Sequence, residues 1–227
     1  MTELFDSYRG NYRDVVQTSI DFSGLPHDFF MRAKAELLRA LIAERLGGGK
    51  PAMLDVGCGV GSFHPFIRGT VDRLSGIDVS ASSVAQARAD NPQNEYRAFD
   101  GKRFPYADAS FDLATAICVL HHVAPAEWLR FMGEMRRVVR PGGLVCVTEH
   151  NPLNPLTRLA VMRCEFDRDA RLLGAGKTRE LMAVSGLREI DARYFVLLPW
   201  EAKPARKIER ALRHLPLGAQ YAAFGTA

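Results

Sequence analysis

Short, mostly apolar runs alternate along the chain with segments in which apolar residues recur at helical spacing. The short runs cover residues 51–56, 73–80, 95–100, 111–120 and 144–150, and Gly, Pro, Asp or Ser residues border them. Runs of this length predict strands, and those that stay apolar at successive positions predict strands buried on both faces.

The segments between these runs have the pattern of helices. Residues 27–49 carry apolar side chains at 37, 38, 41, 42 and 46 and end in glycines suited to a C-cap. Further helices are predicted at 62–67, at 80–91, where Ser80 would be the N-cap, and from about 125 to 139, where Arg-Pro-Gly-Gly would end the helix. Strands that alternate with helices indicate an open, doubly wound α/β fold with a mostly parallel sheet, whose ligand lies outside the C-terminal ends of the strands.

Length and composition are those of one domain. With 227 residues, of which 47% are hydrophobic, the chain can bury one large core without disulfides or metal ions. The four cysteines are far apart and form no C-x-x-C pair, which predicts reduced thiols in a cytoplasmic protein. Charged residues begin at position 3, and no run of about 18 uncharged apolar residues occurs, so neither a signal peptide nor a membrane span is expected.

The net charge of +4 is unevenly distributed. Residues 151–227 hold 13 Lys and Arg against 8 Asp and Glu, whereas the rest of the chain is nearly neutral. This excess could mark an anionic partner. It contains no run of three or more consecutive basic residues and no aromatic residues interleaved with such a run, so a solvated face is the simpler interpretation and a nucleic-acid partner is not expected.

Three glycines follow the first predicted strand in the stretch MLDVGCGVG. Gly57, Gly59 and Gly61 would let a ligand approach the backbone, and the N-terminus of the next helix would offer N–H groups to an anion. A side chain placed at Gly57 or Gly59 is expected to enter the space of that ligand. The dinucleotide fingerprint G-x-G-x-x-G would have its third glycine at Ser62, one position later, which weakens an NAD-binding interpretation.

Asp78 ends the second predicted strand, 21 residues after Gly57. A carboxylate at this place can accept hydrogen bonds from both ribose hydroxyls of a nucleoside. Its alternative role is to cap the following helix, which Ser80 could equally do.

Taken together, these motifs resemble those of the class I S-adenosylmethionine-dependent methyltransferases, in particular the branch of ubiquinone/menaquinone-type and other small-molecule enzymes. The resemblance runs from residue 53 to 151 and rests on LDVGCGVGSF, GIDVS, FDGKRFPYADASFD, ICVLHHV and RPGGLVCVTEHN, in this order. It implies a Rossmann-like methyltransferase fold with a seven-stranded sheet, whose final antiparallel hairpin would be residues 188–198 and 220–226. It also implies S-adenosylmethionine as the cofactor.

The resemblance assigns the cofactor site residue by residue. The methionine part would lie on the turn of Gly57, Gly59 and Gly61, near Asp55 and the backbone of Cys118. Asp78 would hold the ribose, Val79 would lie against the adenine, Asp100 would accept from the adenine amino group, and Gly101 and Lys102 would offer backbone contacts. Taken alone, Asp100 also suits a surface turn, and Val79 and Cys118 also suit the core.

Chemistry at such a site needs alignment more than activation. The sulfonium already activates the methyl group, so the protein must align the acceptor, exclude water and, for a hydroxyl or amine acceptor, supply a base. His121, His122 and His150 lie at or just after predicted strand ends, and we expect His122 first and His150 second to act as catalytic bases; capping or packing roles are the alternative. No metal site is predicted, because adjacent histidines point in different directions and no H-x-x-x-H pair is present.

Substrate selection is expected to come from the segments outside the shared core. Four segments are predicted: an N-terminal lid and helix region at 1–50, a cofactor-binding core at 51–150, a substrate-side insertion at 151–177, and a C-terminal helix with antiparallel strands at 178–227. Tyr8, Tyr12 and Phe22 would cover the cofactor; the alternative is that these segments are surface helices packed on the core. A cationic rim would come from four arginines of the insertion, Arg158, Arg163, Arg168 and Arg171.

The predicted function is methyl transfer to a small-molecule acceptor that is aromatic, lipid-like or anionic. A nucleic-acid or protein methyltransferase is the alternative, although the Asn/Asp-Pro-Pro-aromatic motif of amino-methylating DNA enzymes does not follow the fourth strand. A nicotinamide oxidoreductase conflicts with Ser62. A noncatalytic protein that binds the cofactor has the same pocket motifs.

Overall fold

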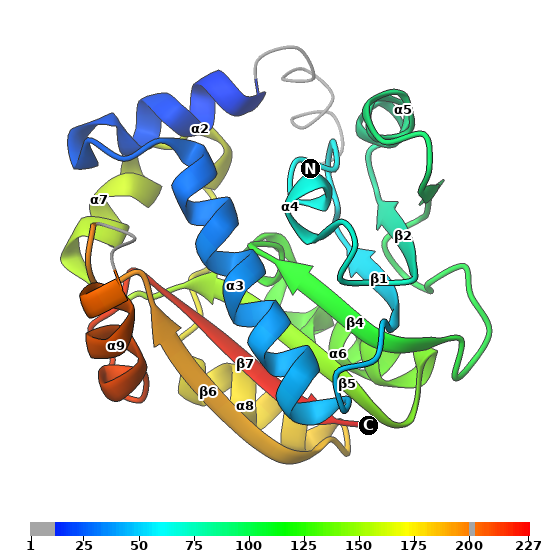
Figure 1. Ribbon diagram of the computed structural model, residues 1–227. Helices are drawn as coiled ribbons and strands as arrows, with labels where there is room; N and C mark the ends of the chain where they lie inside the picture. Colours follow the sequence, from blue (N-terminus) through cyan, green and yellow to red (C-terminus); the bar gives the residue numbers. More distant parts are fainter. Residues whose placement is uncertain (1–11, 200–202) are drawn as a thin grey trace.

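The computed structural model describes residues 12–199 and 203–227, with side chains from residue 14 to 199 and from 207 onward (Figure 1). Within these residues one seven-stranded sheet has the order β3-β2-β1-β4-β5-β7-β6. The strands are β1 (Ala52–Val56), β2 (Arg73–Asp78), β3 (Glu95–Ala98), β4 (Phe111–Ile117), β5 (Val139–His150), β6 (Arg188–Phe195) and β7 (Gln220–Thr226). Strands β1 to β5 pair in parallel, and β7 is antiparallel to both β5 and β6. The predicted α/β class, mostly parallel sheet and final antiparallel hairpin are confirmed.

Helices connect the strands and extend beyond them. The α-helices are α2 (Tyr12–Ile20), α3 (His27–Arg45), α4 (His64–Ile67), α5 (Ala81–Asp90), α6 (Trp128–Val138), α7 (Pro155–Arg163), α8 (Ala175–Val184) and α9 (Lys203–Leu212). Short 3-10 turns cover Asp21–Ser23, Leu120–His122, Pro125–Glu127 and Glu165–Asp167. Among the described helices, none is both long enough and apolar enough to cross a membrane.

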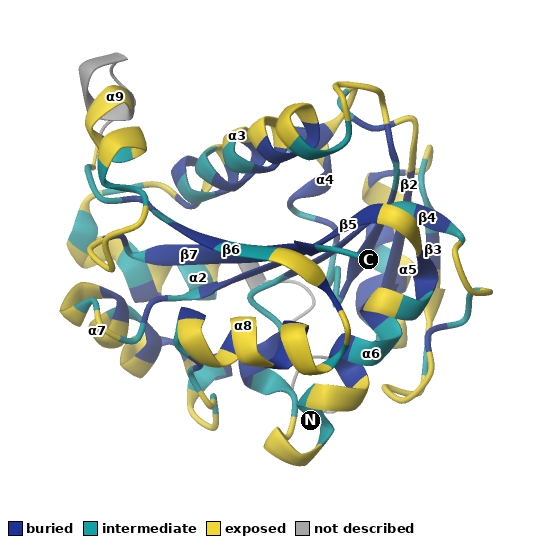
Figure 2. Ribbon diagram, turned by 90° about the horizontal axis from the view of Figure 1, so that it is seen from below, coloured by how far each residue is buried: buried dark blue, intermediate teal, exposed yellow. Residues whose placement is uncertain are grey.

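Two hydrophobic cores lie on opposite faces of the sheet. Helices α3 and α4 cover one face, and α6 and α8 cover the other (Figure 2). Successive residues of β1 divide between them: Met53 packs with the α3 side and Leu54 with the α6 side. Each face of the central strands is therefore buried, as the unbroken apolar runs predict.

Several strand ends differ from the prediction: β2, β3 and β4 end two or three residues early, and β5 and β6 differ for identifiable reasons. Strand β5 begins at Val139 rather than Leu144, because the Arg-Pro-Gly-Gly segment continues into the strand after a shift of register against β4. Gly142 makes this possible with a φ of 80°, and its N–H donates to the carbonyl of Ala227. Strand β6 ends at Phe195 because Val196 takes a left-handed conformation with φ of 57°.

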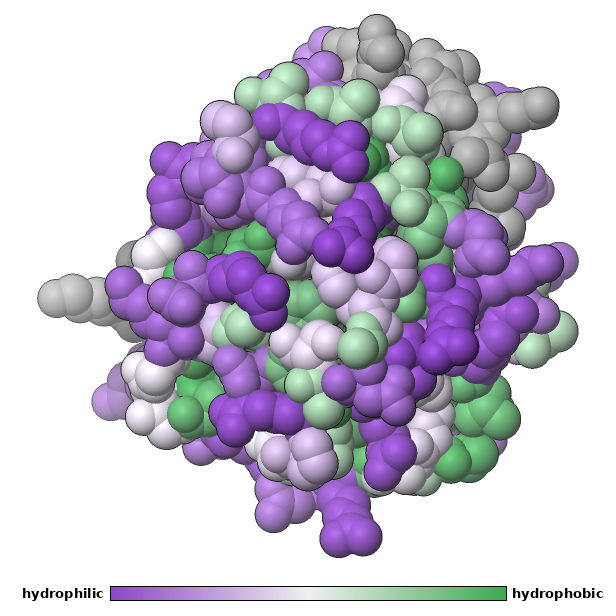
Figure 3. All heavy atoms as spheres, turned by 90° about the vertical axis from the view of Figure 1, so that its right-hand side faces the viewer, coloured by the Kyte–Doolittle hydropathy of each residue, from purple (hydrophilic) through white to green (hydrophobic). Residues whose placement is uncertain are grey.

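The C-terminal ends of the parallel strands are covered rather than open. Helices α2 and α7, far apart in the sequence, contact each other beside these ends (Figure 1). On the β3 side of the molecule hydrophilic residues prevail, and hydrophobic residues lie mostly between them (Figure 3). Because α2 and α7 lie beside the C-terminal ends of the parallel strands, they border the region where a doubly wound sheet binds its ligand.

Candidate active site

A cavity of about 1000 Å³ lies at the C-terminal ends of β1, β2, β4 and β5. Its walls also include residues of α2, α3 and α7. Small-molecule sites range over about 300–1,000 Å³, so this cavity is at the upper end of that range. It has room for a nucleoside cofactor together with a second molecule.

The glycine turn after β1 forms one wall, and its three glycines have different roles. All three have positive φ, which favours glycine. A Cβ at Gly59 would meet nothing within 4 Å, and this residue lines the cavity. A Cβ at Gly57, which also lines the cavity, would lie 2.6 Å from the Val119 side chain. A side chain at Gly57 would therefore first collide with Val119, which follows β4 and also lines the cavity, and its entry into the ligand space stays a prediction.

Gly61 is outside the cavity lining and packs against the protein. A Cβ there would lie 3.0–3.2 Å from atoms of Asn91, His64 and Tyr96. The turn therefore has one glycine open toward the cavity and two glycines that permit close packing behind it.

Asp55, 3% exposed, lies at the end of β1 on the wall of the cavity. Its Oδ1 accepts a hydrogen bond from Thr115 Oγ1 at 3.0 Å, and its Oδ2 lies 2.9 Å from His64 Nε2. The other ring nitrogen of His64 lies 2.5 Å from the Tyr96 hydroxyl. If Nε2 carries the proton, the imidazole donates to Asp55 and accepts from Tyr96, which fixes the carboxylate in place.

Asp78 is held with its carboxylate at the cavity. Oδ2 accepts from the N–H of Gly59 at 2.8 Å, and Oδ1 accepts from the N–H of Ser80 at 2.9 Å. Burial raises the pKa of Asp78, while these backbone bonds oppose the rise. Ser80 caps α5, as predicted, by accepting from Ser83 N–H at 3.1 Å. Because each carboxylate oxygen has two acceptor sites, Asp78 can still accept from a ligand.

Asp100 closes an exposed turn on the same wall. Its Oδ1 accepts from the N–H of Lys102 at 2.8 Å and of Arg103 at 3.3 Å, and these bonds hold its pKa below the usual value. Val79, Asp100 and Gly101 all line the cavity, whereas Lys102 does not. Lys102 therefore acts on this wall only through the turn it stabilises.

Two buried polar atoms on the cavity wall have no hydrogen-bond partner within the described residues. They are Ser62 Oγ and Gln220 Oε1. A buried polar atom left unpaired costs about 1–3 kcal/mol, and a ligand that bonds to it recovers this cost. The open Gly59, the Asp78 carboxylate and these two atoms all fit a nucleoside cofactor with polar ends.

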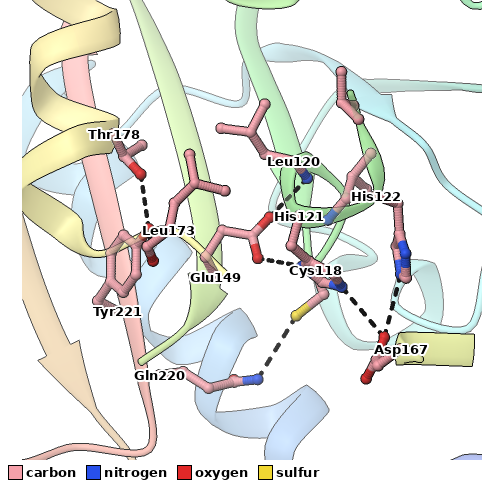
Figure 4. A network of polar contacts seen from close by, with 12 residues as sticks. Cys118, Leu120, His121, His122, Glu149, Asp167, Leu173, Thr178, Gln220 and Tyr221 are labelled. Atoms are coloured by element: carbon pink, nitrogen blue, oxygen red, sulfur yellow. Dashed lines mark hydrogen bonds and ion pairs between the residues drawn. The ribbon is translucent and has the colours of Figure 1, made fainter. Parts of the chain in front are cut away.

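A buried ion-pair network continues from the ends of β4 and β5 (Figure 4). Glu149, 1% exposed, accepts from the N–H groups of Val119 at 3.1 Å and Leu120 at 2.7 Å through Oε1. Its Oε2 lies 2.5 Å from His121 Nδ1. The other ring nitrogen of His121 lies 3.4 Å from Asp167 Oδ1.

The two adjacent histidines have pKa values shifted in opposite directions. Burial by itself would lower the pKa of His121, but Glu149 and Asp167 hold this pKa well above its usual value. His122 Nε2 lies 3.3 Å from Asp167 Oδ1, yet burial and the neighbouring His121 lower the pKa of His122 to about 4. His122 is therefore uncharged at neutral pH, and its ring lines the cavity.

Cys118 and His150 face each other across the ends of the same two strands. Cys118 has a φ of 56°, unusual outside glycine, and its N–H donates to the Thr148 carbonyl at 2.8 Å. Burial would raise the pKa of the Cys118 thiol, but Lys34 and His150 lower it overall. Burial would lower the pKa of His150, and Cys118 raises it. Both residues line the cavity.

The remaining wall is mainly apolar and comes from the segments outside the core. It includes Phe22, Phe30, Leu156, Val161 and Phe166. The Arg163 guanidinium lies 5.5 Å from the centre of the Phe22 ring, which links the N-terminal segment to α7.

The expected cationic rim is absent from the described cavity wall. None of the four arginines at 158, 163, 168 and 171 lines it, since the insertion turns apolar residues and Asp167 inward. Tyr8 and the side chain of Tyr12 lie outside the described residues, so their predicted covering role stays a prediction.

Sequence reasoning missed three polar residues of this site, Glu149, Asp167 and Gln220. Glu149 adjoins His150 on an apolar strand, and a charged residue inside a buried strand is a usable signal of a paired charge. Asp167 arrives from the end of the insertion and Gln220 from the last strand, so no local spacing connects either of them to the histidines.

Comparison with known families agrees with this geometry. Residues 54–147 match the family model described as "Methyltransferase domain". The α/β fold, with its cavity at the C-terminal ends of the strands, is that of a domain that binds a nucleoside-containing cofactor. The matched segment is a methyltransferase domain of the class I S-adenosylmethionine-dependent type, whose cofactor is S-adenosylmethionine.

Several relatives can be aligned over part of their length. The chain is 35% identical over 127 residues to the malonyl-[acyl-carrier protein] O-methyltransferase of Pseudescherichia vulneris, covering 54% of this chain and 47% of that protein. It is 30% identical over 149 residues to the demethylmenaquinone methyltransferase of Beutenbergia cavernae, covering 64% of this chain and 56% of that protein. The chain thus spans about half the length of these curated relatives.

A solved structure is similar over its whole length. The Thermotoga maritima protein described as a SAM-dependent methyltransferase, possible histamine N-methyltransferase, has a TM-score of 0.68 with 18% identity. The match covers 100% of this chain and 99% of that chain, and at this identity it shows the shared fold.

Proposed function

We propose that the protein transfers the methyl group of S-adenosylmethionine to a small, largely apolar organic acceptor. The observation that carries this proposal is one cavity with two unlike ends. One end has the open glycine turn and the Asp78 carboxylate, and the other has apolar walls beside an uncharged histidine. Two ligands of different polarity fit such a cavity.

Residues of the core would hold the cofactor. Asp78 would accept from the ribose hydroxyls. Val79 and Gly101 would flank the adenine, and Asp100 would accept from its amino group. The methionine part would lie along Gly57 and Gly59, near Asp55 and the backbone of Cys118, with Gly61 and Lys102 supporting the two turns from outside the cavity.

When bound, S-adenosylmethionine supplies a methyl carbon whose bond to sulfur breaks on transfer, leaving S-adenosylhomocysteine. The protein's own part is to bring an acceptor atom into line and to take its proton. His122 is the first candidate for that base, because it is uncharged and faces the cavity, and Asp167 beside it would stabilise the imidazolium. His150 is the second candidate and also faces the cavity.

The acceptor class follows from the walls. Phe22, Leu156, Val161 and Phe166 line this end, and the contact between α2 and α7 beside it would limit the access of water and of a duplex. The relatives named for malonyl-[acyl-carrier protein] and demethylmenaquinone favour the branch that acts on lipid-like or quinone-type molecules. Four free cysteines fit a reducing compartment, so a cytoplasmic location is part of the proposal.

A methyl-transfer screen tests this function. Phenolic, quinol, acyl and phosphorylated molecules, with DNA and RNA in parallel, are incubated with S-adenosylmethionine, and S-adenosylhomocysteine release is measured. We expect release with a phenolic, quinol or acyl molecule and a decrease in kcat of about 10²–10⁴-fold in His122→Ala, as for loss of a general base. The exposed His214→Ala is the matched control. Methyl transfer to nucleic acid alone would contradict the proposed function. Full activity of His122→Ala would show that His122 is not the catalytic base.

A further inference from the structure

Three side chains from separate segments converge on one point of the cavity wall. His121 follows β4, His150 ends β5, and Asp167 ends the 3-10 turn after α7. One ligand-type atom of each lies within 4.8 Å of the other two. His121 Nε2 and Asp167 Oδ1 are 3.4 Å apart.

That separation is close to the one a tetrahedral metal ion imposes. Ligand atoms about 2.0–2.1 Å from a zinc ion in this geometry lie about 3.3–3.4 Å from one another. The His121 and Asp167 atoms are therefore already at the separation of two zinc ligands, and the His150 atom lies within 4.8 Å of both.

The surroundings of His121 are those of a metal-ligating histidine. Its Nδ1 lies 2.5 Å from Glu149, whose other oxygen is fixed by two backbone N–H groups. A histidine that binds a metal through one ring nitrogen commonly donates the other N–H to a carboxylate, which sets the tautomer and the ring orientation. Glu149 therefore leaves Nε2 as the nitrogen directed at Asp167.

We propose that His121, His150 and Asp167 form a binding site for a divalent transition-metal ion of the Zn²⁺ type. Two imidazoles and one carboxylate favour such an ion over Mg²⁺ or Ca²⁺, which prefer oxygen ligands. Three protein ligands leave at least one coordination position open, which distinguishes a catalytic site from a structural one. The ion would replace the proton on His121 Nε2 that otherwise bonds to Asp167.

The position of the ion also narrows the acceptor. All three ligands line the cavity, so the open coordination position faces the enclosed space next to His122. Resting here on the proposed function with His122, not the ligand His150, as the base, we assign the acceptor atom to a hydroxyl oxygen that would lie between the ion and the His122 ring. Metal binding itself does not depend on that function.

The test is metal binding to the full-length protein without cofactor or acceptor. Chelator-treated protein is titrated with Co²⁺, whose visible absorption reports coordination number, and with Zn²⁺ in competition with a chromophoric chelator. We expect one ion per chain with a four- or five-coordinate Co²⁺ spectrum. Asp167→Asn and His150→Ala should weaken binding by more than about 100-fold, because a ligand matters more than its supporting group, and Glu149→Gln by about 10–100-fold.

His214→Ala, which alters an exposed histidine distant from the cluster in the sequence, is the matched control and should bind as the unaltered protein does. Circular dichroism shows whether each variant is folded. If His150→Ala does not fold, Asp167→Asn, which preserves the size of the side chain, still tests the proposal. No stoichiometric binding, or equal binding by Asp167→Asn and His214→Ala, would overturn the proposal. Affinity for S-adenosylhomocysteine, measured separately on the same samples, shows whether the cofactor site survives such a result.

Discussion

Replacing Glu149 by glutamine should lower the free energy of unfolding by about 1.5–3 kcal/mol. The carboxylate is 1% exposed and accepts three hydrogen bonds, two from backbone N–H groups and one from His121. The amide oxygen of glutamine can keep the two backbone bonds. Its NH₂ group then faces His121 Nδ1, so the one charge-assisted bond is lost, and a bond to a charged group contributes about 1.5–3 kcal/mol.

The measurement is urea denaturation at pH 7 with EDTA present, so that no bound metal contributes. Glu180→Gln is the matched control, because Glu180 forms an exposed ion pair with Lys177 at 2.8 Å and such pairs contribute about 0–1 kcal/mol. A midpoint for Glu149→Gln equal to that of the control would refute the view that this buried pair fixes the ends of β4 and β5.

Three further substitutions, one at Asp78 and two in the glycine turn, test the cofactor end of the cavity. Asp78→Ala should weaken S-adenosylhomocysteine binding about 10–100-fold in calorimetry, because two hydrogen bonds to its carboxylate are lost. Asp169→Ala, at an exposed carboxylate, is the control. Equal affinity of the two variants would show that Asp78 does not bind the cofactor. Gly59→Val should abolish that binding while circular dichroism stays native, with some loss of Tm because φ is positive at this residue. Gly57→Val should lower Tm further, because its side chain would also meet Val119. Tight binding in both variants would leave the turn without a role in binding.

The fold was largely predictable because its signals are local. The glycine turn, the serine cap of α5 and the unbroken apolar strands each depend on neighbouring residues, and the structure has them at the expected places. The start of β5 was not predictable, because Arg-Pro-Gly-Gly is typical of a turn. Its pairing with β4 and with the last residue of the chain depends on tertiary contacts.

The site divides in the same way. Asp78 was predictable from its distance to the glycines, since both follow adjacent strands. The acceptor end was not, because Asp167 reaches the histidines only through the path of the insertion. Arginines in that insertion suggested a cationic rim, but the insertion directs apolar residues and Asp167 to the cavity and leaves these arginines out of its lining. Composition alone does not give the direction of a side chain.

A crystal structure with bound S-adenosylhomocysteine tests the two-ended cavity most directly. We predict that its ribose hydroxyls bond to Asp78 and that its sulfur faces His122 and the apolar walls of α2 and α7. A ribose distant from Asp78, or a sulfur directed away from those walls, would contradict the proposed arrangement of cofactor and acceptor.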